Sequence, residues 1–242
     1  FRSPLYFFLN IFGLSIGVAA CSLLIHYATF ESNYDAYISN VQNKYRILVR
    51  DEGGISANTP VPVHSLMKED FAQIKSATAI RLAVGVMRSN STGKPMVSDD
   101  ETNVVSATKG YFDIFDADFI YGKSAPLTEP GKIYISKDLA VKYFGKPDAV
   151  GESLTFFESN FGQIDLTVSG VYQNPRPDTH LPEHGVFAMK NIEGSQNPWA
   201  TMDNWGWNEF YTYVELNDNA RLTQEERNDF IDKYIGKENR ER

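Results

Sequence analysis

Residues 180–184 are the part of this chain that comes nearest to a catalytic motif. They read His180-Leu181-Pro182-Glu183-His184, which matches the HxxEH string of one class of zinc proteases. That chemistry needs both histidines on one face of a helix, with the glutamate beside them. Pro182 lies inside the string, and Pro175 and Pro177 precede it. The sequence therefore predicts a loop at this point and no metal site.

Two other groups of side chains have the types that ligand sites use. Asp113, Asp116 and Asp118 lie close together but lack the glycine spacing of a calcium-binding loop, so we expect a solvated face. Five aromatic residues near the C-terminus could line a pocket, although aromatic residues beside strands more often belong to the core. These are Trp199, Trp205, Trp207, Tyr211 and Tyr213.

The sequence also lacks the usual signatures of nucleotide and acyl chemistry. It contains no GxxxxGK[ST] phosphate loop, no GxSxG nucleophile elbow and no GxGxxG. Any ATP hydrolysis must therefore come from another chain or region. We expect no catalytic residue, no metal and no cofactor, and we expect that the protein is not an enzyme.

Composition and net charge narrow the class of protein further. The chain has 242 residues, enough for one large or two smaller domains, and its aromatic content of 13% is not that of a disordered chain. A net charge of −8 gives no electrostatic basis for binding nucleic acid. Cys21 is the single cysteine, so an intramolecular disulfide is impossible.

Residues 5–30 predict a membrane-spanning helix, the first segment of the chain (1–30). They contain no Asp, Glu, Lys or Arg, and a bilayer core needs about 20 such residues. A cleaved signal peptide would have a shorter apolar region, and a lipoprotein would turn polar after Cys21, where this chain stays apolar. Arg2 precedes the span, which places the N-terminus in the cytoplasm and the residues after about 30 outside it.

Gly13 and Gly17 lie one turn apart in this span. Such a pair lets two membrane helices approach closely, so we expect helix packing there. The alternative is that glycine is simply common in membrane helices.

Residues 31–44 predict a stalk helix that continues the span. An apolar stripe at helical spacing runs along it: Phe30, Tyr34, Ile38, Val41 and Tyr45. We expect this stripe to pack against the folded domain or a partner stalk and to carry movement between them. Glycine at Ile38 and Val41 is expected to cost about 1 kcal/mol of helix propensity at each position.

Beyond the stalk, strand and helix patterns mix, and the predicted fold class is α+β. Strands are expected at 45–50, 78–88, 102–107, 132–136, 185–189 and 209–216, with a hairpin at 153–157 and 164–172. Helices are expected at 60–74, 109–115 and 137–144, the last between Ser136 as N-cap and Gly145 as C-cap. Thr223 begins a capping-box pattern for a final helix.

The run FLNIFGLSIGVAACSLLIHYATFESNYDAY followed by YRILV resembles the first membrane helix and stalk of MacB/FtsX-type ABC-transporter permeases. The later runs YFDIFDADFIYGK, ISKDLAVKYFG, VGESL, VSGVYQNPRPDTHL and WNEFYTYVEL resemble the extracytoplasmic domain of that family. The resemblance covers nearly the whole chain.

This resemblance implies a domain of two parts. A porter-like βαβ part would be built from residues 45–108 and 185–242, and a smaller α/β part would be inserted at 109–184. Full-length members carry three more membrane helices, so we expect this chain to be a fragment of a permease.

The resemblance also implies the setting and the partners. These are the bacterial inner membrane, a cytoplasmic ATP-binding subunit, and a homodimer or a related permease. The expected function is coupling of ATP-driven motion to export or to an external partner. The alternative is a membrane-anchored binding or regulatory module without transport, for example one that controls a cell-wall hydrolase.

Overall fold

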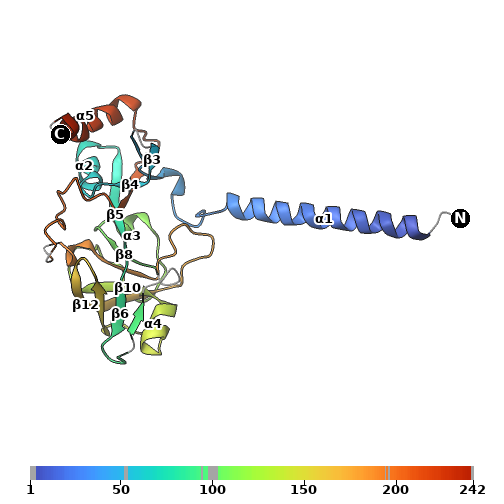
Figure 1. The fold of residues 1–242 in the computed structure, drawn as a ribbon, viewed down its shortest axis with the longest axis horizontal. Coiled ribbons are helices and arrows are strands. Elements are labelled where there is room, and N and C mark those ends of the chain that lie inside the picture. The colour runs from blue at the N-terminus through green and yellow to red at the C-terminus, as the bar shows by residue number, and fades with distance from the viewer. Residues whose placement is uncertain are drawn as a thin grey trace.

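A long helix and a mixed α/β domain make up the protein (Figure 1). The structure is a computed structural model that describes residues 4–51, 54–93, 95–97, 103–193, 195 and 197–240. The helix, α1 (Pro4–Ser32), extends away from the domain and none of its residues is buried. It is long and apolar enough to cross a membrane, with a mean hydropathy of 2.1 in its most apolar window. Its exposed apolar side chains would be covered by lipid in that setting.

The predicted stalk helix over 31–44 is wrong. α1 ends at Ser32, residues 33–40 form turns, and a short 3-10 helix follows at Val41–Asn43. Asp35 has a φ of 59° and Asn40 a φ of 50°, both in the left-handed region. A right-handed helix cannot contain such residues, and asparagine and aspartate are the non-glycine residues that tolerate this region best. The apolar stripe therefore does not lie along one helical face.

Twelve strands form one sheet among the described residues, in the order β1-β14-β5-β8-β13-β10-β12-β11-β6-β7, with β4 beside β14 and β9 beside β12. The strands of this sheet are β1 (Lys44–Arg46), β4 (Asn58–Thr59), β5 (Ile74–Ala83), β6 (Val86–Ser89), β7 (Pro95–Val97), β8 (Val104–Ala107), β9 (Phe119–Gly122), β10 (Lys132–Ser136), β11 (Ser153–Glu158), β12 (Gly162–Tyr172), β13 (Gly185–Ala188) and β14 (Phe210–Leu216). β2 (Val49–Asp51) and β3 (Gly54–Ser56) form a separate hairpin.

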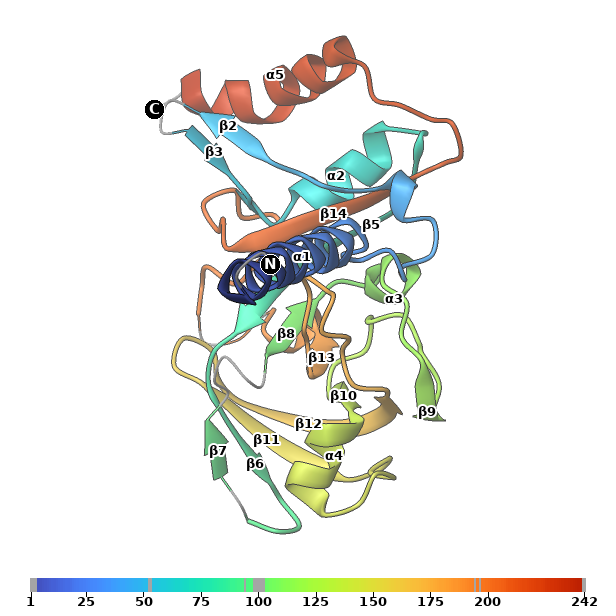
Figure 2. The same cartoon turned by 90° about the vertical axis from the view of Figure 1, so that its right-hand side faces the viewer.

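Four helices pack around the strands. They are α2 (Val63–Asp70), α3 (Tyr111–Ile114), α4 (Lys137–Phe144) and α5 (Gln224–Arg240), and a 3-10 turn, η2, covers Met189–Asn191. Figure 2 shows α2 and α5 at one end of the domain and α4 at the other. Separate hydrophobic clusters fill the two ends, and a third lies beneath α3.

Local signals in the sequence produced α4 and α5 as expected. The Ser136 hydroxyl accepts a hydrogen bond from Leu139 N, and Gly145 ends α4 with a φ of 72°. At α5, the Thr223 hydroxyl accepts from Glu226 N at 3.2 Å, and the Glu226 carboxylate accepts from Thr223 N at 2.7 Å. These are the reciprocal contacts of a capping box.

The sheet runs without interruption through the predicted domain boundaries. β6, from the predicted first segment (45–108), pairs with β11, from the predicted insert (109–184). β13 begins the predicted last segment (185–242), and it pairs with β10 on one side and β8 on the other. The division into a porter-like part and an insert stays a prediction, while the strands of all three segments share one sheet.

Candidate functional site

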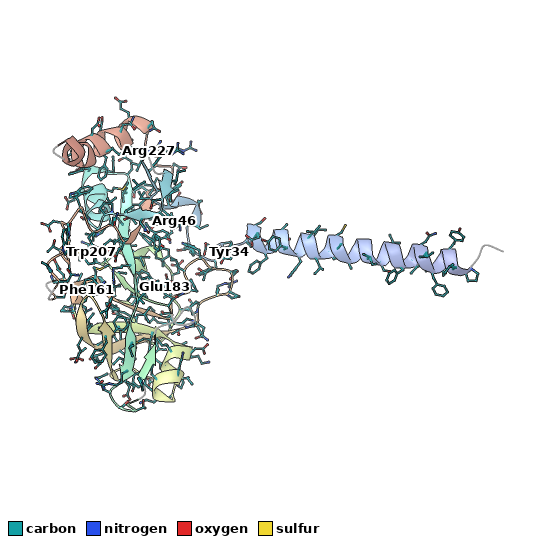
Figure 3. The ribbon with its side chains drawn as sticks, in the orientation of Figure 1. Tyr34, Arg46, Phe161, Glu183, Trp207 and Arg227 are labelled. Carbon is teal, nitrogen blue, oxygen red and sulfur yellow. The ribbon has the colours of Figure 1, made fainter. Side chains whose placement is uncertain are left out.

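The segment that joins α1 to the domain is the best-defined polar site in the described structure. We call it the joint, and it consists of residues 33–40 together with residues 175–184. In sequence the two segments are more than 130 positions apart. Figure 3 shows Tyr34 where α1 meets the domain and Glu183 deeper in the domain.

Asp35 is the centre of the joint. Its backbone N donates to the carbonyl of Asp178 at 2.9 Å. Its carboxylate accepts from the Thr179 hydroxyl at 2.9 Å and from the backbone N of His180 at 3.1 Å. The second carboxylate oxygen lies 2.5 Å from His180 Nδ1. Asp35, whose backbone is in the left-handed region, therefore connects the start of the domain to residues 175–184.

Two tyrosines add to this contact from the same side. Tyr34 donates from its hydroxyl to the carbonyl of Thr179 at 2.8 Å, and Tyr37 donates to the Thr179 hydroxyl at 3.0 Å. The guanidinium of Arg176 lies 5.1 Å from the centre of the Tyr37 ring and also pairs with Asp178 at 2.8 Å. Thr179 is buried beneath these groups. The joint thus holds both hydroxyl-bearing rings in fixed positions.

A second set of contacts ties the joint to α3 and the turn that follows it. The side chain of Ile38 is only 5% exposed and packs in the cluster beneath α3. Ser39 donates from its backbone N to the Asp116 carboxylate at 2.6 Å and from its hydroxyl at 3.1 Å. The Lys44 ammonium donates to the carbonyl of Ile114 at 2.5 Å. Residues 35–44 are therefore anchored at several points.

His180 carries the network into the sheet. Its Nε2 lies 3.0 Å from the Tyr213 hydroxyl on β14, the strand that also pairs with β1 and β5. Burial raises the pKa of the Tyr213 hydroxyl to about 12, so it keeps its proton at neutral pH. The path Asp35–His180–Tyr213 consequently links the segment after α1 to β14, the second strand from one edge of the sheet.

A cavity of about 220 Å³ lies beside the joint. Aromatic rings form much of its wall, among them Tyr37, Tyr111 and Tyr172, and Glu183 also lines it. Burial raises the pKa of the Glu183 carboxyl to about 8. The Tyr172 hydroxyl donates to the backbone carbonyl of Glu183 at 2.8 Å, which fixes the chain at this point.

The predicted stalk residues have different surroundings in the structure. Ile38 is buried, and Tyr34 is hydrogen-bonded with its ring packed edge-on against Phe30 at 6.0 Å. Val41 and Tyr45 are exposed. The role of these residues in coupling stays a prediction. The expected loss of helix propensity on substitution by glycine does not apply to Ile38, which lies in a turn.

The glycine pair of the span is open on the single chain. A Cβ added at Gly13 or Gly17 would meet no atom within 4 Å. Packing of a second helix against this pair is therefore sterically free, and it stays a prediction.

The loop predicted at residues 180–184 is confirmed, because the segment has no helical residue. His180 bonds to Asp35, while His184 Nδ1 lies 2.8 Å from the Ser136 hydroxyl. The two histidines thus have separate partners. Within the described residues no group of three or more His, Cys, Asp or Glu side chains could hold a metal ion.

The other candidate ligand groups are also dispersed. Asp116 binds Ser39, and Asp113 lies 3.5 Å from the Ser76 hydroxyl. Trp207 is buried against Phe161 and Phe210, as expected for a core residue, whereas Trp199 is 64% exposed. Trp205 stacks on Tyr234 of α5, Tyr213 is buried on β14 beside His180 of the joint, and Tyr211 is exposed.

Sequence reasoning missed the role of Asp35, Ser39 and Thr179. It weighed His180 only as a metal ligand. The available signal was the run Ser32-Asn33-Tyr34-Asp35, since asparagine and aspartate are typical of turns and interrupt a helical pattern. The partner segment could not have been paired with it from spacing alone.

Comparisons with known proteins agree on the family. The sequence model of the MacB-like periplasmic core domain matches residues 7–227. A solved domain of a permease protein from Porphyromonas gingivalis is similar, with a TM-score of 0.62 and 19% identity, over 84% of this chain and 86% of that one. The periplasmic region of MacB from Actinobacillus actinomycetemcomitans is similar with a TM-score of 0.56 and 15% identity, over 82% of this chain and 88% of that one.

At these identities the two solved structures show a shared fold. No curated protein matches the chain. The family match extends across the joint and nearly all of the domain, and the apolar helix precedes that domain as it does in the predicted permease arrangement. The chain therefore belongs to the MacB-like periplasmic core domain family, as part of a MacB/FtsX-type ABC transporter permease.

Proposed function

We propose that the chain is the part of a permease subunit that passes movement from its membrane helix to its extracytoplasmic domain. The observation that carries this proposal is the Asp35 contact with Thr179 and His180. A tether needs no such contact, because a flexible linker would hold the domain at the membrane equally well. The hydrogen bonds of the joint would instead pass rotation and tilt of α1 to the domain.

The supporting arrangement continues into the sheet. His180 reaches Tyr213 on β14, and β14 pairs with β1, β4 and β5. Elements that are joined by packed side chains and hydrogen bonds move as one rigid body. A hinge-type transition requires such rigid bodies. The domain would then tilt with α1.

This role requires partners. The described chain contains no phosphate loop, so a cytoplasmic ATP-binding subunit would supply the energy. A second permease chain, either a copy or a relative, would give α1 something to move against. We place the complex in the bacterial inner membrane, with export of a substrate or action on an external partner as its output.

The test is Asp35→Ala in the full-length permease, assembled with its ATP-binding subunit. Alanine removes all three carboxylate contacts, and we expect coupled transport to fall by about tenfold, the effect of about 1.4 kcal/mol on the active arrangement. ATP hydrolysis should persist. Asp35→Asn is the matched variant, because asparagine tolerates the left-handed backbone and still offers one acceptor oxygen. It should retain more transport than alanine does.

Folding must be checked in parallel, by thermal unfolding of the purified complex. Undiminished export by a folded Asp35→Ala complex would contradict the proposal and leave the joint as a tether. If instead ATP hydrolysis and export were intact while an associated cell-wall activity was lost, the regulatory alternative would replace the transport role.

A further inference from the structure

The cavity beside the joint has both buried and exposed lining residues. Tyr111, Tyr172 and Glu183 are among the buried ones, and Asp116 and Arg176 are among the exposed ones. The domain therefore shields part of the cavity, while its exposed residues leave it open to solvent. Ligand pockets commonly measure about 300–1,000 Å³, so a volume of about 220 Å³ suits a small molecule.

Glu183 is the buried acidic group of this cavity. It is 7% exposed, and it forms no ion pair with a basic side chain in the part of the chain that the structure describes. The Tyr111 hydroxyl donates a hydrogen bond to its carboxyl. A buried carboxyl without a counter-ion costs free energy, and a glutamine would fill the same space at a smaller cost. A cation bound in the cavity would supply the missing counter-ion.

Aromatic rings make up much of the remaining lining. They are Tyr37, Tyr111, Phe112, Phe115 and Tyr172. The ring of Tyr111 stands at 86° to that of Phe112 and at 45° to that of Phe115, so these rings do not stack into one flat wall. The face of an aromatic ring attracts a cation within about 6 Å of its centre. The guanidinium of Arg176, 5.1 Å from the centre of the Tyr37 ring, already makes such a contact at this cavity.

The basic side chains near the cavity have acidic neighbours. Arg176 belongs to the lining, and it pairs with Asp178 at 2.8 Å. Lys44 is attracted by Asp116. Lys109, which precedes α3, is exposed and does not line the cavity. These positive charges are therefore offset before they reach Glu183.

The acidic side chains are balanced less completely. Asp35 faces His180, and its charge also acts on the Glu183 carboxyl. Asp118 lines the cavity and, like Glu183, has no basic partner within the described residues. The arrangement consequently favours a positively charged ligand over a neutral or negative one.

We propose that this cavity binds a small organic ammonium ion, with Glu183 as its counter-ion and the aromatic rings against its alkyl groups. Aromatic cages are the usual environment in which proteins hold quaternary ammonium groups. Attraction between the ammonium and the carboxylate is stronger in a buried site than in water. The inference concerns binding alone and does not rest on the proposed role in coupling.

Binding of such a cation should release a proton. Burial raises the pKa of the Glu183 carboxyl to about 8, so the empty cavity holds it neutral at pH 7. A cation beside the carboxyl favours the ionised form and lowers that pKa. The affinity for a permanently charged cation should therefore rise with pH up to about 8 and be constant above it.

The experiment is calorimetric titration of the full chain, purified in a maltoside detergent, with choline and with tetramethylammonium. Neither probe titrates, so any pH dependence belongs to the protein. We expect saturable binding that tightens by about tenfold or more between pH 6 and 8. Dimethylbutanol, the neutral carbon isostere of choline, should bind at least about tenfold more weakly.

Substitutions assign the contacts. Glu183→Gln should weaken choline binding by about tenfold at pH 8 and remove the rise with pH. It leaves His180, the other group near these rings that titrates close to neutral pH, in place. Glu193→Gln, at an exposed glutamate outside the cavity, should bind as the parent does.

Tyr37 tests the rings. Tyr37→Phe and Tyr37→Leu both lose the hydrogen bond to Thr179, and only phenylalanine keeps the ring. We expect Tyr37→Phe to retain affinity and Tyr37→Leu to lose about threefold or more. Thermal unfolding of each variant shows whether it is folded.

Three results would overturn the proposal. Neither cation could saturate the parent chain, dimethylbutanol could bind as tightly as choline, or folded Glu183→Gln could bind choline with the parent's affinity and pH dependence. Any of them would mean that the cavity does not recognise an ammonium group.

Discussion

Glu183 is the residue of the joint whose environment is most unlike water. Its side chain is buried, and aromatic rings surround the cavity beside it. Burial disfavours the charged carboxylate and raises its pKa to about 8 from an ordinary 4.5. The native state therefore holds a proton on Glu183 at neutral pH that the unfolded chain releases.

The stability of the domain should depend on pH through this group. Below about pH 4.5 both states are protonated and Glu183 contributes no pH dependence. Between about 4.5 and about 8 the unfolded state has lost the proton and the native state keeps it, so the free energy of unfolding falls as pH rises. Above about 8 both states are ionised and the fall ends.

Glu183→Gln should remove this dependence, because the amide is neutral throughout. We expect the variant to be more stable than the parent at pH 8, by on the order of 3 kcal/mol, and similar to it at about pH 4. Chemical denaturation across this range measures the effect. Glu193→Gln, at an exposed glutamate, is the control and should retain the parent's pH dependence. Parallel curves for the parent and Glu183→Gln would show that Glu183 does not carry the shift.

At the scale of elements, α1 stands apart from the rest of the fold. All its residues are exposed in the single chain, and packing that does not come from the domain must come from lipid or other helices. Gly13 and Gly17 leave a flat strip one turn long on which another backbone can approach. Gly13→Leu with Gly17→Leu fills that strip while keeping the helix apolar.

We expect this double variant to weaken association of α1 by about tenfold, or about 1.4 kcal/mol. Energy transfer between labelled chains in detergent or bilayers measures it. Leu14→Val with Val18→Leu changes neighbouring positions without filling the strip, and it should associate as the parent does. Equal association of all three chains would mean that these glycines are only tolerated by the helix.

Elements with local signals could be predicted from the sequence, and elements fixed by distant contacts could not. Ser136 and Gly145 define α4 by capping, and Thr223 with Glu226 defines the start of α5. The turn at Asp35 is held by Thr179 and His180, and no local pattern encodes a partner 144 positions away. The apolar stripe predicted a helix there because Tyr34 and Ile38 have helical spacing. In the structure the two side chains have unrelated surroundings, since Tyr34 is hydrogen-bonded at the surface and Ile38 is buried.

Short edge elements were missed for a related reason. β4, β7 and β9 are two to four residues long and depend on the strands beside them. The strand and helix patterns predicted the fold class and the apolar run predicted the membrane helix, and the family resemblance added the setting and the partners. Neither predicted the joint, because residues 33–40 were expected in a helix and residues 180–184 in a loop with no assigned partner.

At the scale of the whole molecule, one buried ion pair connects distant strands. Arg81 on β5 pairs with Glu158 at the end of β11, and its guanidinium also lies 4.6 Å from the centre of the Phe161 ring. Both charged side chains are almost fully buried. β5 and β11 are third and eighth in the strand order, so this pair joins two strands that have four others between them.

Arg81→Met should destabilise the domain by about 3–5 kcal/mol, since it leaves the Glu158 carboxylate buried and unpaired. Arg81→Met with Glu158→Gln should recover much of that loss, because no buried charge remains and Glu209, which pairs with Arg81 at 3.2 Å, is exposed. Lys233→Met, which breaks the exposed pair with Asp70, is the control and should cost less than about 1 kcal/mol. Unfolding in denaturant compares the variants. If the double variant were as unstable as Arg81→Met, the loss would come from packing of the Arg81 side chain and not from the unpaired Glu158 carboxylate.

The long separation between the two halves of the joint also sets the order in which the protein is made. Tyr34 and Thr179 are 145 positions apart, and β1 pairs with β14, whose residues come later still. At about 5–20 residues per second, roughly 7–30 s pass between synthesis of the two halves. During that interval Asp35, Ile38 and β1 wait beside the newly inserted α1 without their partners. A ribosome that stalls before residue 180 therefore leaves an anchored chain with an open strand edge at the membrane, which is a natural substrate for membrane-bound chaperones and proteases.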